Sequence, residues 1–330
     1  MVLEKYKNLL KNYLQSKDET ALYRADQFSK QSLQQEISPD EIVQIHIDAM
    51  QDLYPDLPED MRLSLHFLLE TMISYGIAHH EFRALREKQL ELKYEIEVAA
   101  NMQNTLLNTV IPDVEELDIG AVSVAAQQMN GDYYHFIQDH RNVGVAVADV
   151  IGKGIPAALC MSMIKYALDT YPDNLSSPKT ILKLLNRVVE RNVEPGMFIT
   201  MFYGFYNDED HSFHYASAGH EPGLFYDASS DSFEKMETKG IVLGVEENTS
   251  YQQYSKILSV GDMIILFTDG VTECRRGDQF IQTEEILDII KQYIHMSAQE
   301  IVDHVYRYFE RLQDFDLRDD FTLIILRRNS

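Results

Sequence analysis

The chain changes character near Ile111-Pro112, and this change constrains its fold more than any other feature of the sequence. Before that point Gly76 is the only glycine, and apolar residues recur at the spacing of amphipathic helices. After it, short apolar runs bounded by turn residues predict strands. A chain of 330 residues is long enough for two domains. We therefore expect an all-α domain followed by a strand-rich domain.

The first part is expected to form a small helical bundle, which we assign to residues 1–84. Ser38-Pro39-Asp40-Glu41 places a capping residue before a proline at the first helical position and an acid at the third. Pro55 and Pro58 bracket a short turn before the next apolar face. The spacing of these faces predicts four helices, which pack most simply as a bundle.

Residues 85–111 are expected to form a linker, most of it within one charged helix from about Glu81 to Leu107. Its apolar residues recur every seven positions, at Leu85, Leu92, Ala99 and Leu106. Lys88 and Glu95 take other positions where a heptad needs apolar residues, so we predict a weak or switchable coiled coil. A single amphipathic helix lying on its own domain is the alternative interpretation.

Residues 112–330 are expected to form an α+β domain, an antiparallel β-sandwich flanked by helices. Two helices are predicted in succession, at Pro156–Thr170 and Pro178–Glu190, and two more follow Asp269, near Thr283–Tyr293 and from the capping box Ser297-Ala298-Gln299-Glu300. The clearest strands are Ile119–Ala125, Tyr133–Ile137, Val143–Val147, Thr200–Tyr206, Phe213–Ala218, Gly223–Tyr226, Met263–Phe267 and Phe321–Leu326.

Charge and cysteine content exclude several classes of function. With 29 basic and 53 acidic residues the net charge is −24, which argues against binding to nucleic acid or to anionic membranes. No apolar run approaches the length of a membrane span, and the amino terminus lacks a signal-peptide core. Two cysteines, Cys160 and Cys274, do not support a disulfide framework or a thiolate zinc site. We expect a cytoplasmic protein.

Four aspartates end or begin strand-like runs in the second part: Asp132, Asp149, Asp269 and Asp319. A carboxylate carried toward a core is costly when it is unpaired, and several such groups repel one another. Hard divalent cations with oxygen ligands relieve that repulsion. Any one of these motifs is also an ordinary turn, and Arg318-Asp319-Asp320 could be a solvated loop charge pair. Together they predict a two-metal centre, which needs about this many carboxylates.

The alternation of side chains along the strands supports this prediction. In Val143–Asp149 the valines alternate with smaller residues, and Asp149 falls in register with the valines. Side chains alternate faces along a strand, so Asp149 should point to the face on which the valines pack. Met263–Phe267 is apolar at every position, which predicts a strand buried on both faces.

The ordered motifs of residues 112–330 resemble PPM-type (protein phosphatase 2C-like) serine/threonine phosphatases, in particular the bacterial stress and sporulation branch. The motifs are Gly131-Asp132-Tyr133-Tyr134, Ala148–Gly154, Ser217-Ala218-Gly219-His220-Glu221-Pro222, Phe267–Glu273 and Asp319-Asp320-Phe321-Thr322. The resemblance implies an antiparallel β-sandwich flanked by helices, with two Mn²⁺ or Mg²⁺ ions at one end.

The same resemblance implies roles for individual residues. Asp149 would bridge both ions, and the backbone carbonyl of Val150 would bind the first. Asp269 and Asp319 would hold the second ion, while Asp132 would ligate through bound water. Water activated by the ions would attack the phosphorus in line, and the ions would neutralise charge on the phosphoryl group.

The chain departs from many eukaryotic members at two places. Val150 and Ile151 stand where those members have a glycine and a histidine, and Gln127 and Gln128 stand near where they have a phosphate-binding arginine. The leaving-group acid and the phosphate clamp are therefore unassigned. Lys153 is a candidate substitute for the clamp, although a solvent-facing lysine is the simpler interpretation.

Two other features of the motifs are interpreted as structural. His220 lies in a turn between two predicted strands, where a histidine is more often structural than catalytic. Gly152-Lys153-Gly154 precedes a helix but lacks the spacing and the hydroxyl residue of a nucleotide-binding loop. Its glycines would allow a sharp turn into the helix that begins near Pro156.

The resemblance also implies partners. In this branch the amino-terminal bundle forms a homodimer and binds a kinase-like activator protein, and the substrate is a phosphoserine on a small anti-sigma-factor antagonist. Dephosphorylation would turn on the general stress sigma factor. As a hypothesis, activator binding orders the Leu85–Leu106 helix in a dimer and shifts the helix pair after Pro156. That shift would bring the Asp149 loop into metal-binding register.

Two alternatives of other kinds stay open. A phosphatase-like domain could be catalytically inactive and serve as a signalling scaffold, although all four acids are present. A two-metal hydrolase could instead act on a small phosphoester or a nucleotide, which calls for stacking aromatic residues in the pocket. The chain has no tryptophan, and Tyr133 and Tyr134 do not decide the question.

Overall fold

The computed structural model describes residues 2–17, 19–35, 37–152, 154–170, 175–193, 196–276, 279–281, 283–313 and 317–329. The chain folds into two compact units, Met1–Tyr94 and Glu95–Ser330. We call them the helical unit and the catalytic unit, the second after the four aspartates of the predicted metal centre, which it contains. Among the described residues no helix is long and apolar enough to cross a membrane.

The helical unit consists of α1 (Val2–Ser16), α2 (Glu19–Gln34), α3 (Pro39–Leu53) and the first part of α4 (Glu59–Leu107). The predicted capping box at the start of α3 is confirmed. The Ser38 hydroxyl accepts the Glu41 N–H at 3.3 Å, and the Glu41 carboxylate accepts the Ser38 N–H at 3.0 Å. Phe28 is buried and its ring lies 5.3 Å from that of Tyr6, so a small apolar core joins α1 and α2.

The predicted separation of the fourth helix from the linker helix is wrong. α4 runs without a break from Glu59 to Leu107 and continues through Gly76. One glycine costs a helix about 1 kcal/mol, and neither a proline nor a capping residue is present to end the helix there. The boundary predicted between residues 84 and 85 thus falls inside a helix, and the compact units divide between Tyr94 and Glu95.

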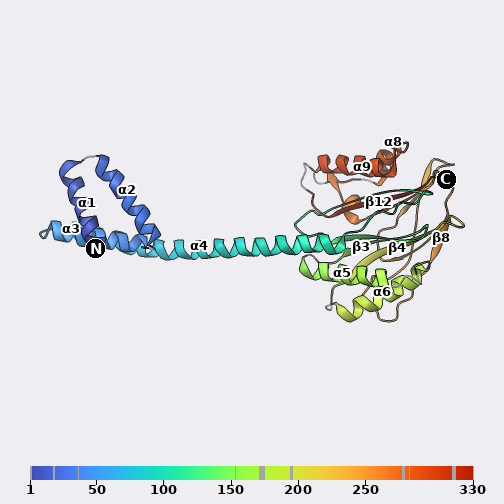
Figure 1. Cartoon of the computed structure of the whole chain (residues 1–330), viewed down its shortest axis with the longest axis horizontal. Coiled ribbons are helices and arrows are strands. Elements are labelled where there is room, and N and C mark those ends of the chain that lie inside the picture. The colour runs from blue at the N-terminus through green and yellow to red at the C-terminus, as the bar shows by residue number, and fades with distance from the viewer. Residues whose placement is uncertain are drawn as a thin grey trace. The chain divides into compact units, whose positions relative to one another are not determined.

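The catalytic unit is a sandwich of two antiparallel sheets, as predicted (Figure 1). One sheet has the order β1-β12-β9-β6-β7, with strands Leu117–Val124, Phe321–Arg328, Met263–Phe267, Leu224–Asp227 and Ser232–Lys235. The other has the order β2-β3-β4-β5-β8, with strands Asp132–Asp139, Asn142–Val150, Ile199–Asn207, Ser212–Ala218 and Tyr254–Ile257. β10 (Arg275–Arg276) and β11 (Gln279–Phe280) form a separate two-stranded hairpin.

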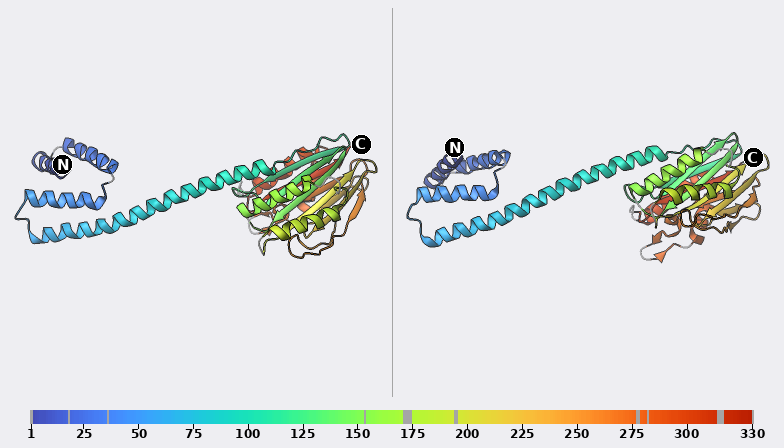
Figure 2. Two further views of the ribbon diagram at one scale, coloured as in Figure 1. Left: turned by 60° about the horizontal axis from the view of Figure 1, so that its bottom comes forward. Right: turned by 90° about the horizontal axis from the view of Figure 1, so that it is seen from below.

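Helices cover the outer faces of both sheets, which gives four layers (Figure 2). α5 (Ile155–Thr170) and α6 (Pro178–Asn192) share an apolar cluster with the β2-β3-β4 sheet. α8 (Thr283–Gln292) and α9 (Ala298–Leu312) share another with the sheet of β9 and β12. A third cluster lies between the sheets and contains Val143, Val145 and Val147. All eight predicted strands and all four helices predicted after residue 150 are confirmed.

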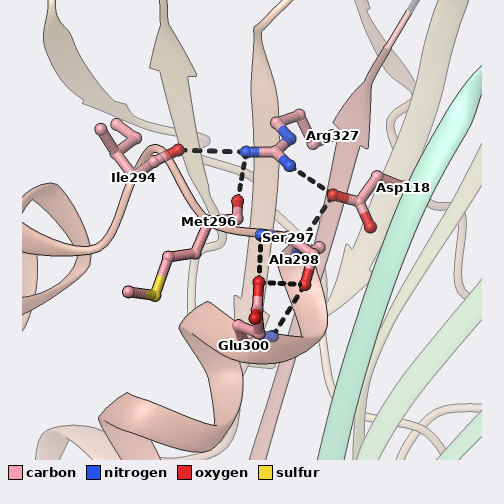
Figure 3. Close-up of polar contacts among 7 residues, drawn as sticks. All are labelled: Asp118, Ile294, Met296, Ser297, Ala298, Glu300 and Arg327. Atoms are coloured by element: carbon pink, nitrogen blue, oxygen red, sulfur yellow. Dashed lines mark hydrogen bonds and ion pairs between the residues drawn. The ribbon is translucent and has the colours of Figure 1, made fainter.

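Hydrogen bonds and an ion pair attach the N-terminus of α9 to strands β1 and β12 (Figure 3). Asp118 of β1 accepts the Ala298 N–H at 2.8 Å and pairs with the Arg327 guanidinium of β12. That guanidinium also donates to two backbone carbonyls, those of Ile294 and Met296, at 3.0 and 2.7 Å. The capping box predicted at Ser297 and Glu300 closes the first turn of α9. These contacts hold α9 firmly against the sheet.

Candidate active site

Asp132 and Asp149 lie directly opposite each other on neighbouring strands. Asp132 is the register partner of Asp149 across β2 and β3, and Asp149 is the partner of Thr200 on β4. Asp149 has the same parity as Val143, Val145 and Val147, which pack between the two sheets. Asp149 therefore lies on the face of its sheet that points toward the other sheet, as its parity predicts. The two carboxylates lie at one end of the sandwich.

Asp132 connects the two sheets through hydroxyl groups. Its Oδ2 accepts hydrogen bonds from Thr268 Oγ1 at 2.6 Å and from Thr322 Oγ1 at 2.7 Å. Thr268 follows β9 and Thr322 lies in β12, so both donors come from the opposite sheet. The carboxyl group is thereby held in one orientation, with its second oxygen available to another ligand.

The environment of Asp132 is unfavourable for a lone negative charge. Burial raises the pKa of the Asp132 carboxyl well above its usual value, and the charges of Asp149 and Asp320 raise it further. The hydrogen bonds from Thr268 and Thr322 act in the opposite direction. Carboxylates gathered in this way are the arrangement that a divalent cation neutralises.

Asp320 and Gly131 shape the loop before Asp132. Asp320 is buried, and its two oxygens accept the backbone N–H groups of Ala126, at 2.8 Å, and of Gly131. A Cβ on Gly131 would stand 3.0 Å from Asp320 Oδ2, 3.8 Å from Asp149 Oδ1 and 3.9 Å from the Val150 carbonyl oxygen. Oxygen atoms therefore crowd around this glycine. The interpretation of Asp320 as part of a solvated loop pair is wrong.

Asp269 and Asp319 form the second part of the site. Asp269 opens the short helix α7 (Asp269–Thr272) directly after β9. Burial raises the pKa of the Asp269 carboxyl, and the charge of Asp319 raises it further. A Cβ on Gly270 would stand 1.9 Å from the Asp320 carbonyl oxygen, so the helix packs tightly against the backbone that follows Asp319. The Asp-Gly pair brings the two carboxylates close together.

The structure thus brings the predicted residues together as two pairs, Asp132 with Asp149 and Asp269 with Asp319. Within the described part of the chain, no group of three His, Cys, Asp or Glu side chains converges on one point that could hold an ion. The donors are carboxylate and carbonyl oxygens, which match the preference of Mn²⁺ and Mg²⁺ for hard ligands. The oxygen donors present are therefore chemically suited to bind these ions.

The end of α4 is hydrogen-bonded to the loop that carries Asp132. Gln103 is buried, and its amide donates to the Asn130 carbonyl at 2.8 Å and accepts the Asn130 N–H at 3.2 Å. Asn130 in turn accepts the Asp132 N–H at 2.9 Å and donates to Ser123 Oγ at 2.9 Å. Gln103 and Asn130 were not predicted, because Gln103 lies among exposed residues of α4 and no local pattern distinguishes it from them.

The structure supports a structural role for His220 and leaves the phosphate clamp unassigned. His220 is buried and its Nδ1 is hydrogen-bonded to Thr200 Oγ1 at 2.8 Å. Burial lowers the pKa of His220 to about 4, so the ring is neutral at physiological pH. Gln127 and Gln128 are exposed, and Lys153 lies outside the described residues.

Solved structures with the same fold are PP2C-type phosphatases. The SiaA-PP2C domain of Pseudomonas aeruginosa matches 74% of this chain and 98% of that chain with a TM-score of 0.62 and 17% identity. The catalytic domain of the serine/threonine protein phosphatase PstP, solved in complex with two manganese ions, matches 65% of this chain and 99% of that chain with a TM-score of 0.50 and 16% identity. The catalytic unit has the PP2C-like (PPM) phosphatase fold.

Sequence comparisons cover both units. The family model described as stage II sporulation protein E (SpoIIE) matches residues 139–329, and the model described as phosphoserine phosphatase RsbU, N-terminal domain, matches residues 4–78. The phosphoserine phosphatase RsbU of Bacillus subtilis (strain 168) is 52% identical over 328 residues, which are 99% of this chain and 98% of that protein. The chain belongs to the RsbU family of PPM-type phosphoserine phosphatases, hydrolases of the bacterial stress response.

Proposed function

We propose that the chain is a cytoplasmic, metal-dependent phosphatase that removes phosphate from a phosphoserine on a small anti-sigma-factor antagonist. A kinase-like activator protein would bind the helical unit of a homodimer and turn the enzyme on, which would release the general stress sigma factor. The observation that carries this proposal is the identity of 52% to a phosphoserine phosphatase across both units. We assign residues 1–84 to the activator-binding bundle, 85–111 to the linker and 112–330 to the phosphatase.

We assign two Mn²⁺ or Mg²⁺ ions to the space between the two sheets at one end of the sandwich. Asp149 and the Val150 carbonyl would hold the first ion, Asp149, Asp269 and Asp319 the second, and Asp132 would ligate through water. When bound, the ions would neutralise charge on the phosphoryl group and activate water. The oxygen atoms crowded around Gly131 and the raised pKa of Asp132 support this assignment.

The residues of the chain itself orient the reaction. Thr268 and Thr322 hold Asp132 as an acceptor, so its free oxygen can position a water molecule at the site. Asp320 fixes the preceding loop through two backbone N–H groups. The carboxylates are thus held in fixed orientations between the sheets, at one end of the sandwich. A phosphoserine can approach this end from solvent, and the fixed groups favour in-line attack on it.

We propose that the helical unit controls the site through α4. Gln103 is joined to Asn130, and Asn130 to the backbone of Asp132, so a movement of α4 at Gln103 would disturb the loop that orients Asp132. Activator binding would order the Leu85–Leu106 segment in the dimer and shift the α5–α6 pair that follows the Asp149 loop. Exposed apolar side chains on α4, such as Leu85 at 69% and Leu92 at 50%, support a partner for this segment.

The substrate class is tested by comparing a phosphoserine protein with free nucleotides. The full chain, with Mn²⁺ and the kinase-like activator, is given the phosphorylated antagonist or ATP at equal concentration, and phosphate release is measured. The proposal predicts release from the phosphoprotein alone. Release from ATP at a comparable rate would favour the small-phosphoester hydrolase, and no release from either would favour the inactive scaffold.

A further inference from the structure

Six residues line a pocket beside α9, which we call the α9 groove. They are Tyr293, His304, Arg307, Tyr308, Arg311 and Leu312. The proposed metal site is built from other residues, so the groove has no role in the chemistry derived above. Its lining combines cationic and aromatic side chains, which is an unusual composition for the surface of a chain with a net charge of −24.

The cations of the α9 groove are two arginines on one side of the helix. Arg307 and Arg311 are exposed and four residues apart, so their side chains are neighbours. Neither guanidinium has an ion pair or a hydrogen bond with any residue that the structure describes, whereas Arg141 and Arg327 are both paired with acids. Two like charges side by side are unfavourable without an anion. The pair is therefore free to bind one.

Two acids on the helices beside the α9 groove, Glu285 and Glu300, are already engaged. Glu285 accepts the phenol O–H of Tyr308, and Glu300 accepts two hydrogen bonds from Ser297 in the capping box. Arginine pairs well with carboxylates and phosphates through its planar fork of donors. The lining therefore favours an anionic ligand that comes from outside the chain.

The Arg311 end of the groove leads to the catalytic carboxylates. Gln313, just after α9, accepts the Arg318 N–H at 3.2 Å and donates to Cys274 Sγ at 2.9 Å. Arg318 is exposed and directly precedes Asp319. Arg311, Gln313 and Arg318 thus connect the end of α9 to the Asp319 loop, so an anionic segment lying on Arg307 and Arg311 could reach the active site with its phosphoserine.

We propose that the α9 groove binds an acidic segment of the phosphoserine protein substrate. A phosphoserine adds close to two negative charges, and the field of this acidic enzyme repels such a partner at a distance. A local row of free arginines next to the site would offset that repulsion and steer the encounter. The inference rests on the proposed function, since it concerns the substrate of that same site.

A pair of charge-reversed variants tests the groove. Arg307→Glu/Arg311→Glu changes the groove, and Lys183→Glu/Arg187→Glu is the matched control, because those two residues are also exposed and four apart, on α6. Full-length enzymes with Mn²⁺ and activator are assayed on the phosphorylated antagonist and on p-nitrophenyl phosphate. At low salt we expect kcat/KM on the phosphoprotein to fall about tenfold in the groove variant through KM, with less than about a twofold change in the control.

Salt and the small substrate complete the test. The defect should shrink as salt rises toward 1 M, where the screening length is about 3 Å, and p-nitrophenyl phosphate should be hydrolysed at an unchanged rate by a folded groove variant. An equal defect in the control variant, or none in the groove variant, would overturn the inference. A native enzyme that does not act on the phosphoprotein would instead overturn the proposed function.

Discussion

The two units of this chain bury apolar surface in different ways. In the catalytic unit three apolar clusters fill the spaces between helices and sheets, and every residue of β9 is buried. In the helical unit α1 has no buried residue, and large apolar side chains of α4 such as Phe67 and Leu63 are 75% and 58% exposed. Contiguous exposed apolar surface generally marks an interaction site.

This difference shows where each unit finds its stability. The catalytic unit completes its core within one chain, so its active site rests on a rigid frame. The helical unit leaves apolar faces uncovered, which suits a segment that forms its remaining contacts with a second copy or with an activator. On the proposed function, the chain therefore separates a permanent catalytic scaffold from an adaptable regulatory one.

The largest expected effect concerns the carboxylates of the catalytic unit. Asp269→Asn should lower kcat/KM on the phosphorylated antagonist by at least about a hundredfold, because the amide removes a charge that would hold the second proposed ion. Phosphate release and circular dichroism should be measured together, with Asp288→Asn on the exposed side of α8 as control. An active Asp269→Asn enzyme would contradict the assignment of this residue.

A matched pair of phenylalanine truncations sharpens the comparison of the cores. Phe309→Ala should cost the catalytic unit about 3–5 kcal/mol, since Phe309 is fully buried in the apolar cluster between α9 and the sheet of β9 and β12. Phe67→Ala should change the stability by less than about 0.5 kcal/mol, because the ring is exposed, yet it should weaken activator binding or dimerisation. Denaturant unfolding measures the first, and sedimentation with the activator the second. Equal losses of stability in the two variants would contradict the difference in packing between the two units.

The pH dependence of stability should reveal the buried histidine of the catalytic unit. The pKa of His220 is lowered by burial to about 4, so the unfolded chain binds the proton more readily. The contribution of His220 to the free energy of unfolding is complete above about pH 6.5 and is lost as the pH falls toward 4. The loss amounts to about 3 kcal/mol. Unfolding of His220→Asn should show a shallower slope in this range. An unchanged slope would assign the acid sensitivity to other groups.

The smallest effect is expected at the linker. Leu92→Asn together with Ala99→Asn should lower the activated rate about tenfold, equivalent to about 1.4 kcal/mol, and leave basal metal-driven hydrolysis unchanged. The polar side chains interrupt the row of apolar residues that recur every seven positions along α4 and that a dimer would bury. Lys93→Asn with Glu97→Asn is the control at exposed polar positions. An unaltered response to the activator in the Leu92 and Ala99 variant would refute the coupling.

Most of the fold could be predicted because its strands carry continuous apolar patterns. The strands that were missed, β7, β8, β10 and β11, have two to four residues each, too few to show the apolar periodicity that reveals a strand. The error at α4 has a different cause. The change from an apolar to a charged composition near Glu81 looked like a boundary, but composition alone does not end a helix without a breaking residue.

The site could be predicted only where local sequence fixes direction. The parity of β3 gave the face of Asp149, but Thr322 lies 190 residues from Asp132, and nothing near either residue indicates that they meet. The role of Asp320 as an acceptor for two N–H groups likewise depends on which strands are neighbours across the sheets. Such roles follow from topology, which the sequence motifs do not carry by themselves.

The most direct test of the account is phosphate release from the phosphorylated antagonist by the full chain, with and without the activator, in Mn²⁺ and in chelator. The account predicts a low basal rate, a large increase on adding activator and no release in chelator. Release that persists in chelator would contradict the metal site. Full activity in Mn²⁺ without the activator would contradict the central claim that an incomplete helical unit controls a complete catalytic one.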